Sequence, residues 1–208
     1  MTPLVVRDHF AVDPSGVVEE FAHEFRPPLV GLVGRKRSGK DTIAAHWVAQ
    51  RGFVRYAFAD ALRDLAMGLD PIITPDMTVR RSARLSDVVD VVGWEGAKSY
   101  AEVRRLLQRL GVAVRDLDED FWLRRVMLKI SASAKPAVVT DVRFTNEAAA
   151  IVAAGGRLVR VVRAGQDDSD THISETALAD YPTHARIDND SDIAALHTRA
   201  DAVLSRLN

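Results

Sequence analysis

The chain has 208 residues, no cysteine and a formal net charge of −1. This length suits one globular domain with small inserted lobes, and the absence of cysteine excludes thiolate catalysis and cysteine-based zinc sites. A balanced charge does not predict binding to nucleic acid. No apolar stretch reaches the ~18–20 residues of a membrane span. Residues 1–10 lack the apolar run of a secretory signal, so we expect a cytoplasmic protein.

In chain order, residues 1–28 are mixed in composition and are interpreted as an N-terminal extension. Strands are predicted at 29–33, 53–58, 137–140, 157–163 and 185–188. Helices are predicted at 40–50, 59–69, 100–110, 121–133, 146–154 and 192–207. Residues 71–100 are expected to form an irregular lobe. Alternating strands and helices predict an α/β three-layer sandwich, with a parallel sheet covered by helices on both faces.

The sharpest motif follows the first strand and opens the first helix, where residues 34–42 read Gly-Arg-Lys-Arg-Ser-Gly-Lys-Asp-Thr. The spacing is that of a nucleotide phosphate loop. Gly34 and Gly39 let the loop curl so that backbone N–H groups face inward, and Lys40 can reach the β- and γ-phosphates. The positive end of the helix adds to the attraction. The candidate donor-binding residues are Gly34, Lys36, Arg37, Ser38, Gly39, Lys40, Asp41 and Thr42.

The metal ligand is less sharply defined than the phosphate loop. Asp41 stands where a serine or threonine usually binds Mg²⁺ through its hydroxyl, and Thr42 comes next. Either residue is a candidate ligand. A third candidate is Asp141, which ends the strand at 137–140 and can order Mg²⁺-bound water.

Three further signals predict the acceptor side. Arg143 follows that strand and can form a bidentate fork with a phosphate, although Asp-x-Arg alone is also typical of a surface ion pair. On the helix predicted at 100–110, Arg104 and Gln108 share one face. Phosphoryl transfer needs extra cations, so Arg104 is a candidate catalytic residue beside Lys40 and Arg143. Trp122 is either a core residue or a surface on which a base stacks.

Together these motifs resemble the tailed-phage deoxynucleoside monophosphate kinases. The resemblance covers roughly residues 29–208, and it runs through 36–42, 104–111, Trp122, 141–143 with Glu147, 161–166, 170–175 and 187–190. It departs from the family pattern at Ala164, where a proline is common, and matches little over 71–100.

The resemblance implies an adenylate-kinase-like fold, ATP with Mg²⁺, and a deoxynucleoside monophosphate (dNMP) acceptor. It also implies an inserted acceptor lobe at about 59–133. The acceptor-binding residues that it implies are Arg104, Gln108, Gly111, Trp122, Arg143 and Glu147.

Other functions remain open at this point. Phosphomevalonate and dephospho-coenzyme A kinases share a phosphate loop and a strand-end aspartate, but segment 104–111 and Trp122 argue against them. A P-loop ATPase switch is disfavoured because the guanine motif Asn-Lys-x-Asp is absent and Asp141 is not followed by glutamate. An intact Lys40 argues against an inactive phosphate site. The sequence leaves open the accepted base, the strictness for deoxyribose and the formation of a homodimer.

Overall fold

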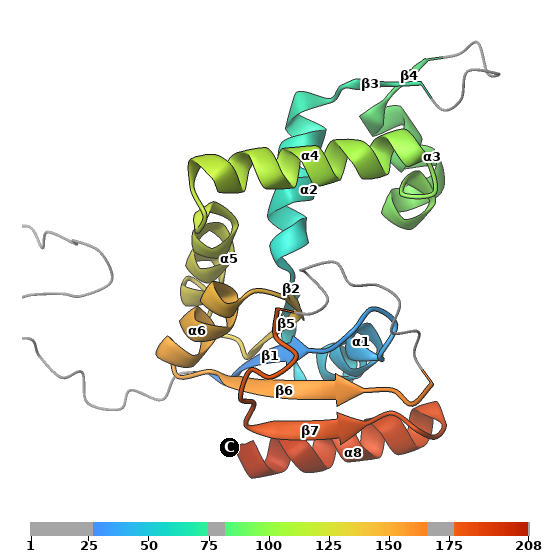
Figure 1. Cartoon of the computed structure of the whole chain (residues 1–208). Coiled ribbons are helices and arrows are strands. Elements are labelled where there is room, and N and C mark those ends of the chain that lie inside the picture. The colour runs from blue at the N-terminus through green and yellow to red at the C-terminus, as the bar shows by residue number, and fades with distance from the viewer. Residues whose placement is uncertain (1–26, 75–81, 166–176, 208) are drawn as a thin grey trace, which may run out of the picture.

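A computed structural model describes residues 27–74, 82–165 and 177–207, and the predicted N-terminal extension therefore lies almost wholly outside the described residues. Within these described ranges, five strands form one sheet in the order β2-β5-β1-β6-β7, and each neighbouring pair is parallel (Figure 1). The strands are β1 (Leu29–Val33), β2 (Val54–Tyr56), β5 (Ala137–Val142), β6 (Arg157–Val162) and β7 (Ala185–Asp188). The predicted α/β class is confirmed.

Helices cover both faces of this sheet (Figure 1). On one face lie α1 (Lys40–Arg51) and α8 (Ile193–Leu207), whose Trp47 and Leu196 pack with strand residues such as Val138 in one buried cluster. On the other lie α5 (Phe121–Ser131) and α6 (Thr145–Ala153) in a second cluster. Strands buried on both faces read as continuous apolar runs, which explains why β1 is so clear in the sequence.

Between β2 and β5 the chain leaves the sheet. It forms α2 (Phe58–Leu69), β3 (Ile72–Ile73), β4 (Ala83–Arg84), α3 (Leu85–Ala97), α4 (Ala101–Leu117) and then α5. Residues of α2, α3, α4 and β3 share an apolar cluster separate from those of the sheet. We propose that this excursion is the expected acceptor lobe. Among the described helices, none has both the length and the apolar character needed to cross a bilayer.

Two predictions about this excursion were wrong. The described residues 71–74 and 82–100 are not irregular, because they contain the antiparallel pair β3–β4 and α3, which is kinked at Gly93 with φ of 66°. Helix α4 does not end at Gly111 but continues for another six residues to Leu117. A Cβ at Gly111 would lie 3.4 Å from Leu62 Cδ2, so the glycine marks a close approach of α4 to α2 rather than a helix end.

Replacing Gly111 with alanine tests this interior position. Alanine is favoured over glycine inside a helix by about 1 kcal/mol, and 3.4 Å is an ordinary contact distance, so Gly111→Ala should raise the free energy of unfolding by roughly 0.5–1 kcal/mol. Urea unfolding measures the change. The matched control is Gly52→Ala at the C-cap of α1, where φ is 69° and alanine should destabilise by roughly 1 kcal/mol. A loss of stability in Gly111→Ala equal to that of the control would contradict the assignment.

Candidate active site

The predicted phosphate loop connects β1 to α1, with left-handed backbone at three positions: Gly34, Arg37 and Gly39 have φ of 148°, 64° and 109°. A Cβ at Gly34 would lie 2.3 Å from the carbonyl oxygen of Val161, and one at Gly39 would lie 2.6 Å from Asn189 Nδ2. Gly34 is therefore required by close packing against backbone as well as by its own conformation, whereas Gly39 is required chiefly by its positive φ.

Lys40 folds back over this loop. Its Nζ donates to the carbonyl oxygens of Gly34 at 2.5 Å and Arg35 at 2.7 Å. Asn189, which follows β7, donates from Nδ2 to the carbonyl oxygen of Ser38 at 2.9 Å and ties the loop to the far edge of the sheet.

The start of α1 suits an anion. Within the described part of the chain, no side chain caps this helix. The N–H groups of a first helical turn have no partner inside the helix, and the helix dipole is positive there. A curled glycine loop, a lysine and an uncapped helix start together fit the polyphosphate of a nucleotide.

Asp141 reaches the same edge of the sheet, at the end of β5, but its carboxylate is engaged with α2. Oδ1 accepts a hydrogen bond from the amide of Phe58 at 2.8 Å, and Oδ2 accepts one from the amide of Ala59 at 2.9 Å. Burial raises the pKa of Asp141, and the two amides oppose that rise. Asp141 thus caps α2 and fixes the base of the excursion to the central sheet. Its predicted contact with Mg²⁺ stays a prediction.

Arg143 lies two residues further along, and Glu147 supports the turn that carries it. Glu147 is buried, and its Oε2 accepts hydrogen bonds from the amides of Arg143 at 2.7 Å and Phe144 at 3.0 Å. Arg143 is half-buried and lines a small cavity together with Gly34 and Arg35. The structure therefore brings the predicted acceptor arginine to the start of the phosphate loop and gives Glu147 a positioning task.

The other predicted acceptor residues lie in the excursion. Trp122 is only 6% exposed, and its Nε1 donates to the carbonyl oxygen of Gly111 at 3.4 Å, which joins α5 to α4. Its predicted stacking on a base requires one ring face to be uncovered and stays a prediction. Arg104 and Gln108 are exposed on α4, and no hydrogen bond or ion pair joins either of them to the described phosphate loop.

Sequence reasoning did not single out the charged cluster around Glu95 in the excursion. Glu95 of α3 pairs with Lys98 at 2.7 Å and Arg63 at 3.7 Å. The hydrogen bond from Lys98 lowers the pKa of Glu95 most, and the nearby charges of Arg63 and Lys36 lower it further. Lys36 belongs to the phosphate loop, so the charge of that loop acts on Glu95 of α3. No sequence motif marks this charge interaction, because Glu95 and Lys36 are about sixty positions apart.

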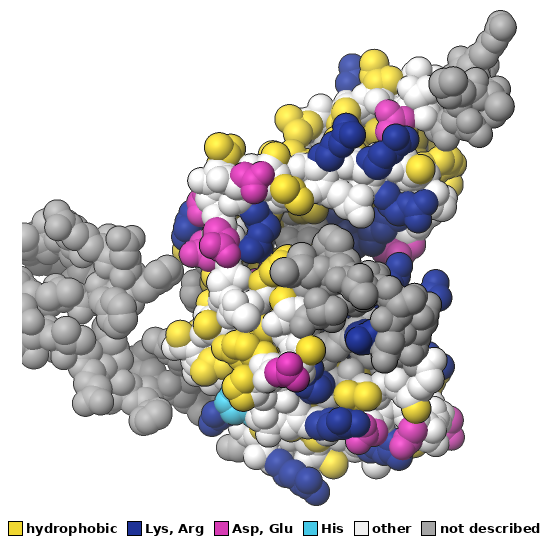
Figure 2. All heavy atoms as spheres, in the orientation of Figure 1, with side chains coloured by type: hydrophobic (Ala, Val, Ile, Leu, Met, Phe, Trp, Pro, Cys, Tyr) yellow, Lys and Arg dark blue, Asp and Glu magenta, His cyan; other side chains and the backbone are white. Residues whose placement is uncertain are grey.

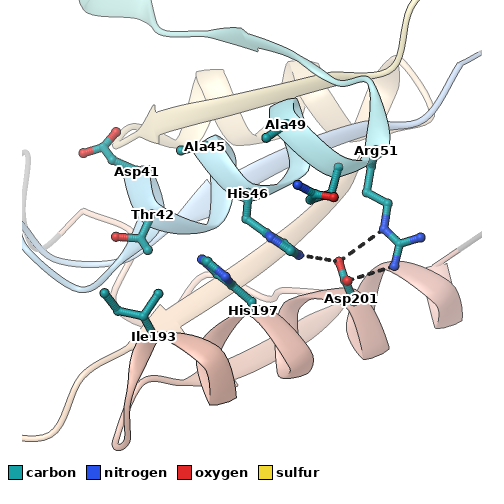
Figure 3. Close-up of a pocket in the computed structure, with 10 residues that line it drawn as sticks. Asp41, Thr42, Ala45, His46, Ala49, Arg51, Ile193, His197 and Asp201 are labelled. Carbon is teal, nitrogen blue, oxygen red and sulfur yellow. Dashed lines mark hydrogen bonds and ion pairs between the residues drawn. The ribbon is translucent and has the colours of Figure 1, made fainter.

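A groove of about 1030 Å³ lies between α1 and α8, the two helices that cover one face of the sheet (Figure 3). Asp201 bridges the two helices by accepting from Arg51 at 2.8 Å and approaching His46 Nε2 at 3.1 Å. Asp41 and Thr42 line the groove's other end, and Thr42 lies on the side of α1 that faces α8 (Figure 3). No group of three or more metal-binding His, Asp or Glu residues occurs among the described residues. The assignments of Asp41 and Thr42 to Mg²⁺ stay predictions.

A buried strand that delivers a curled glycine loop and a lysine to the start of a helix defines the P-loop class of nucleotide-binding proteins. The model of a family described as deoxynucleotide monophosphate kinase matches residues 73–200, which is more than half of the chain. The chain belongs to this family, as the resemblance predicted, and it is a kinase that uses a nucleotide substrate.

Several viral proteins are similar in sequence. A protein of Acanthamoeba polyphaga mimivirus, provisionally named deoxynucleotide monophosphate kinase, is 31% identical over 169 residues, which span 72% of this chain and 81% of the relative. The deoxynucleotide monophosphate kinases of Enterobacteria phage T4 and Escherichia phage RB69 are each 32% identical. Those matches span 60% and 49% of this chain, but only 52% and 44% of the phage proteins.

Among solved structures, a dephospho-CoA kinase from Campylobacter jejuni superposes with a TM-score of 0.47 at 11% identity, over 88% of this chain and 98% of that chain. A TM-score below 0.5 is too low to support a conclusion about fold or function. The fold class therefore rests on the parallel sheet and its helices.

The buried Glu147 predicts a pH-dependent stability. Burial raises the pKa of this carboxyl from 4.5 to about 7, although the hydrogen bonds from the amides of Arg143 and Phe144 lower it. Between these values the native state holds more protons than the unfolded chain, so the free energy of unfolding should fall as pH rises from 4.5 to 7. Glu147→Gln cannot titrate and should remove a fall on the order of 3 kcal/mol. Urea unfolding of both proteins at several pH values measures it, and parallel curves would contradict the prediction.

Proposed function

We propose that this protein transfers the γ-phosphate of ATP to a deoxynucleoside monophosphate, giving ADP and a deoxynucleoside diphosphate. One observation carries the proposal: β1 and β5 are neighbours in a parallel sheet, so the Lys40 loop and Arg143 emerge at the same edge. A donor-phosphate site thus adjoins a cation suited to a second phosphate. Family membership supports a dNMP as the owner of that second phosphate.

The donor would be held mainly by the loop and α1. The amides of the loop and of the first turn of α1 would bind the phosphates. Lys40 would turn from the carbonyl oxygens of Gly34 and Arg35 towards the β- and γ-phosphates as they arrive.

Mg²⁺ would neutralise the charge that develops on these phosphates. Asp41 and Thr42, at the start of α1, are the residues proposed to hold it, with Asp141 as a third candidate. All three supply oxygen atoms, which is the ligand type that Mg²⁺ prefers.

The acceptor would enter from the side of the excursion. Arg143 would hold its phosphate through a bidentate pair, oriented by the hydrogen bonds that Glu147 makes to the turn. Trp122 and segment 104–111 are proposed to contact the nucleoside. Such an enzyme would supply deoxynucleotides for DNA synthesis, in the host cytoplasm if it is encoded by a phage.

A substrate panel tests the proposal. Purified protein is offered ATP and Mg²⁺ with each of the four dNMPs, the matching ribonucleotides, phosphomevalonate and dephospho-coenzyme A, and ADP release is measured. We expect turnover with at least one dNMP and loss of turnover when Mg²⁺ is chelated. Turnover only with phosphomevalonate or dephospho-coenzyme A would identify a different kinase.

Lys40→Met tests the donor site. Loss of one cation over the transferring phosphate commonly costs ~10²–10³ in rate, so kcat should fall by that factor with the fold retained. Circular dichroism and urea unfolding provide the control for the fold. Near-normal ADP release by the variant would show that Lys40 does not act on the transferring phosphate.

A further inference from the structure

Arg160 lies in a row of residues across the centre of the sheet. Val33 at the end of β1 pairs in register with Val142 of β5 on one side and with Arg160 of β6 on the other. Val33 and Val142 belong to the apolar cluster on the α5 and α6 face, so Arg160 projects from that same face. The residues that follow Val33 and Val142 are Gly34 and Arg143, which places Arg160 beside the candidate active site.

Only part of the Arg160 guanidinium is used by the protein. Its Nη2 donates to the carbonyl oxygens of Leu178 at 2.8 Å and Tyr181 at 2.7 Å. A guanidinium has five N–H groups, so three remain. Across residues 27–74, 82–165 and 177–207, no acceptor takes these three and no carboxylate forms an ion pair with Arg160.

This arrangement is costly without an anion. Arg160 is half-buried, and burial lowers the pKa of its guanidinium, while the charge of Asp180 acts in the opposite direction. A cation held away from water is destabilising unless an anion compensates it. Two carbonyl oxygens fix the orientation of the group but carry no full negative charge.

The guanidinium lines a cavity of about 70 Å³ together with Gly34, Arg35, Arg143 and Leu178. Roughly 30 Å³ is the share of one water molecule in the liquid, so the cavity has room for a phosphate group. The cavity lies on the face of Val33 and Val142, whereas α1 covers the opposite face. An anion bound here would therefore lie on the other side of the loop from the start of α1, where the donor is proposed to bind.

We propose that Arg160 is a second ligand of the acceptor's phosphate, opposite Arg143. This inference rests on the proposed function and adds to it a residue that none of the sequence motifs contains. Two guanidinium groups, one just after β5 and one on β6, would hold the acceptor phosphate beside the loop that carries the donor. The bonds to Leu178 and Tyr181 would keep the Arg160 fork in place before the substrate arrives, which lowers the entropy cost of binding.

Binding measurements on Arg160→Gln test the proposal without turnover. Calorimetry measures the affinity for the dNMP preferred in the panel, with saturating ADP on the donor site, and for the corresponding deoxynucleoside, which has no phosphate. We expect roughly tenfold to a hundredfold weaker dNMP binding, with unchanged binding of ADP and of the deoxynucleoside. The matched control is Arg186→Gln, the register partner on β7, which is exposed and pairs with Asp188 at 2.7 Å. It should bind the dNMP as the wild type does.

Arg160→Lys serves as a second variant, because it keeps a cation and donors for the two carbonyl oxygens. It should lose only part of the affinity for the dNMP and none for the deoxynucleoside. Equal losses for both ligands would show that Arg160 merely supports the cavity wall, and unchanged dNMP affinity would show that it does not contact the phosphate. Either result overturns the inference and leaves the proposed function standing. Failure of the wild type to bind any dNMP would instead overturn both.

Discussion

The structure depends on the parallel pairing of β1 between β5 and β6. Parallel strands end at the same edge of a sheet, so this pairing brings three chain segments together that are far apart in the sequence. The phosphate loop follows β1, Arg143 follows β5, and Arg160 lies on β6 in register with Val33. Because β1 is buried on both faces, its position cannot shift without breaking both apolar clusters. The site residues, which lie on or directly after these central strands, are therefore held in fixed positions.

The acidic groups near this edge serve mainly to hold the chain in place. Asp141 caps the start of α2, and Glu147 holds the turn that carries Arg143. Both carboxylates accept hydrogen bonds from backbone N–H groups at or next to the start of a helix, where a negative charge is favourable. This use of acidic groups leaves cations to face the cavity, as the lining by Arg35, Arg143 and Arg160 shows. Such a distribution suits a site that must bring two anionic phosphates together against their mutual repulsion.

In the proposed function, the donor and the acceptor would bind on different sides of the loop. The groove between α1 and α8 begins at Asp41 and Thr42 (Figure 3). The excursion between β2 and β5 carries Glu95, whose pKa is lowered in part by the charge of Lys36 in the loop. Basic side chains are visible where the excursion meets the sheet domain, beside the grey residues that are not described (Figure 2). A kinase needs this separation, because the attacking and leaving oxygens lie roughly in line on opposite sides of the phosphorus.

The sequence by itself determined the phosphate loop, the parallel sheet and the family, because each depends on local order. The spacing of Gly34, Gly39 and Lys40 and the apolar run of β1 are readable along the chain. The sequence could not determine that α4 continues past Gly111. A glycine can end a helix or allow a second helix to pack closely, and only the position of Leu62 beside Gly111 distinguishes the two cases. Nor could the sequence show that Trp122 is buried, that Asp141 caps α2, or that Arg160 faces the cavity. Those facts are contacts between residues distant in sequence, so only the tertiary structure decided them.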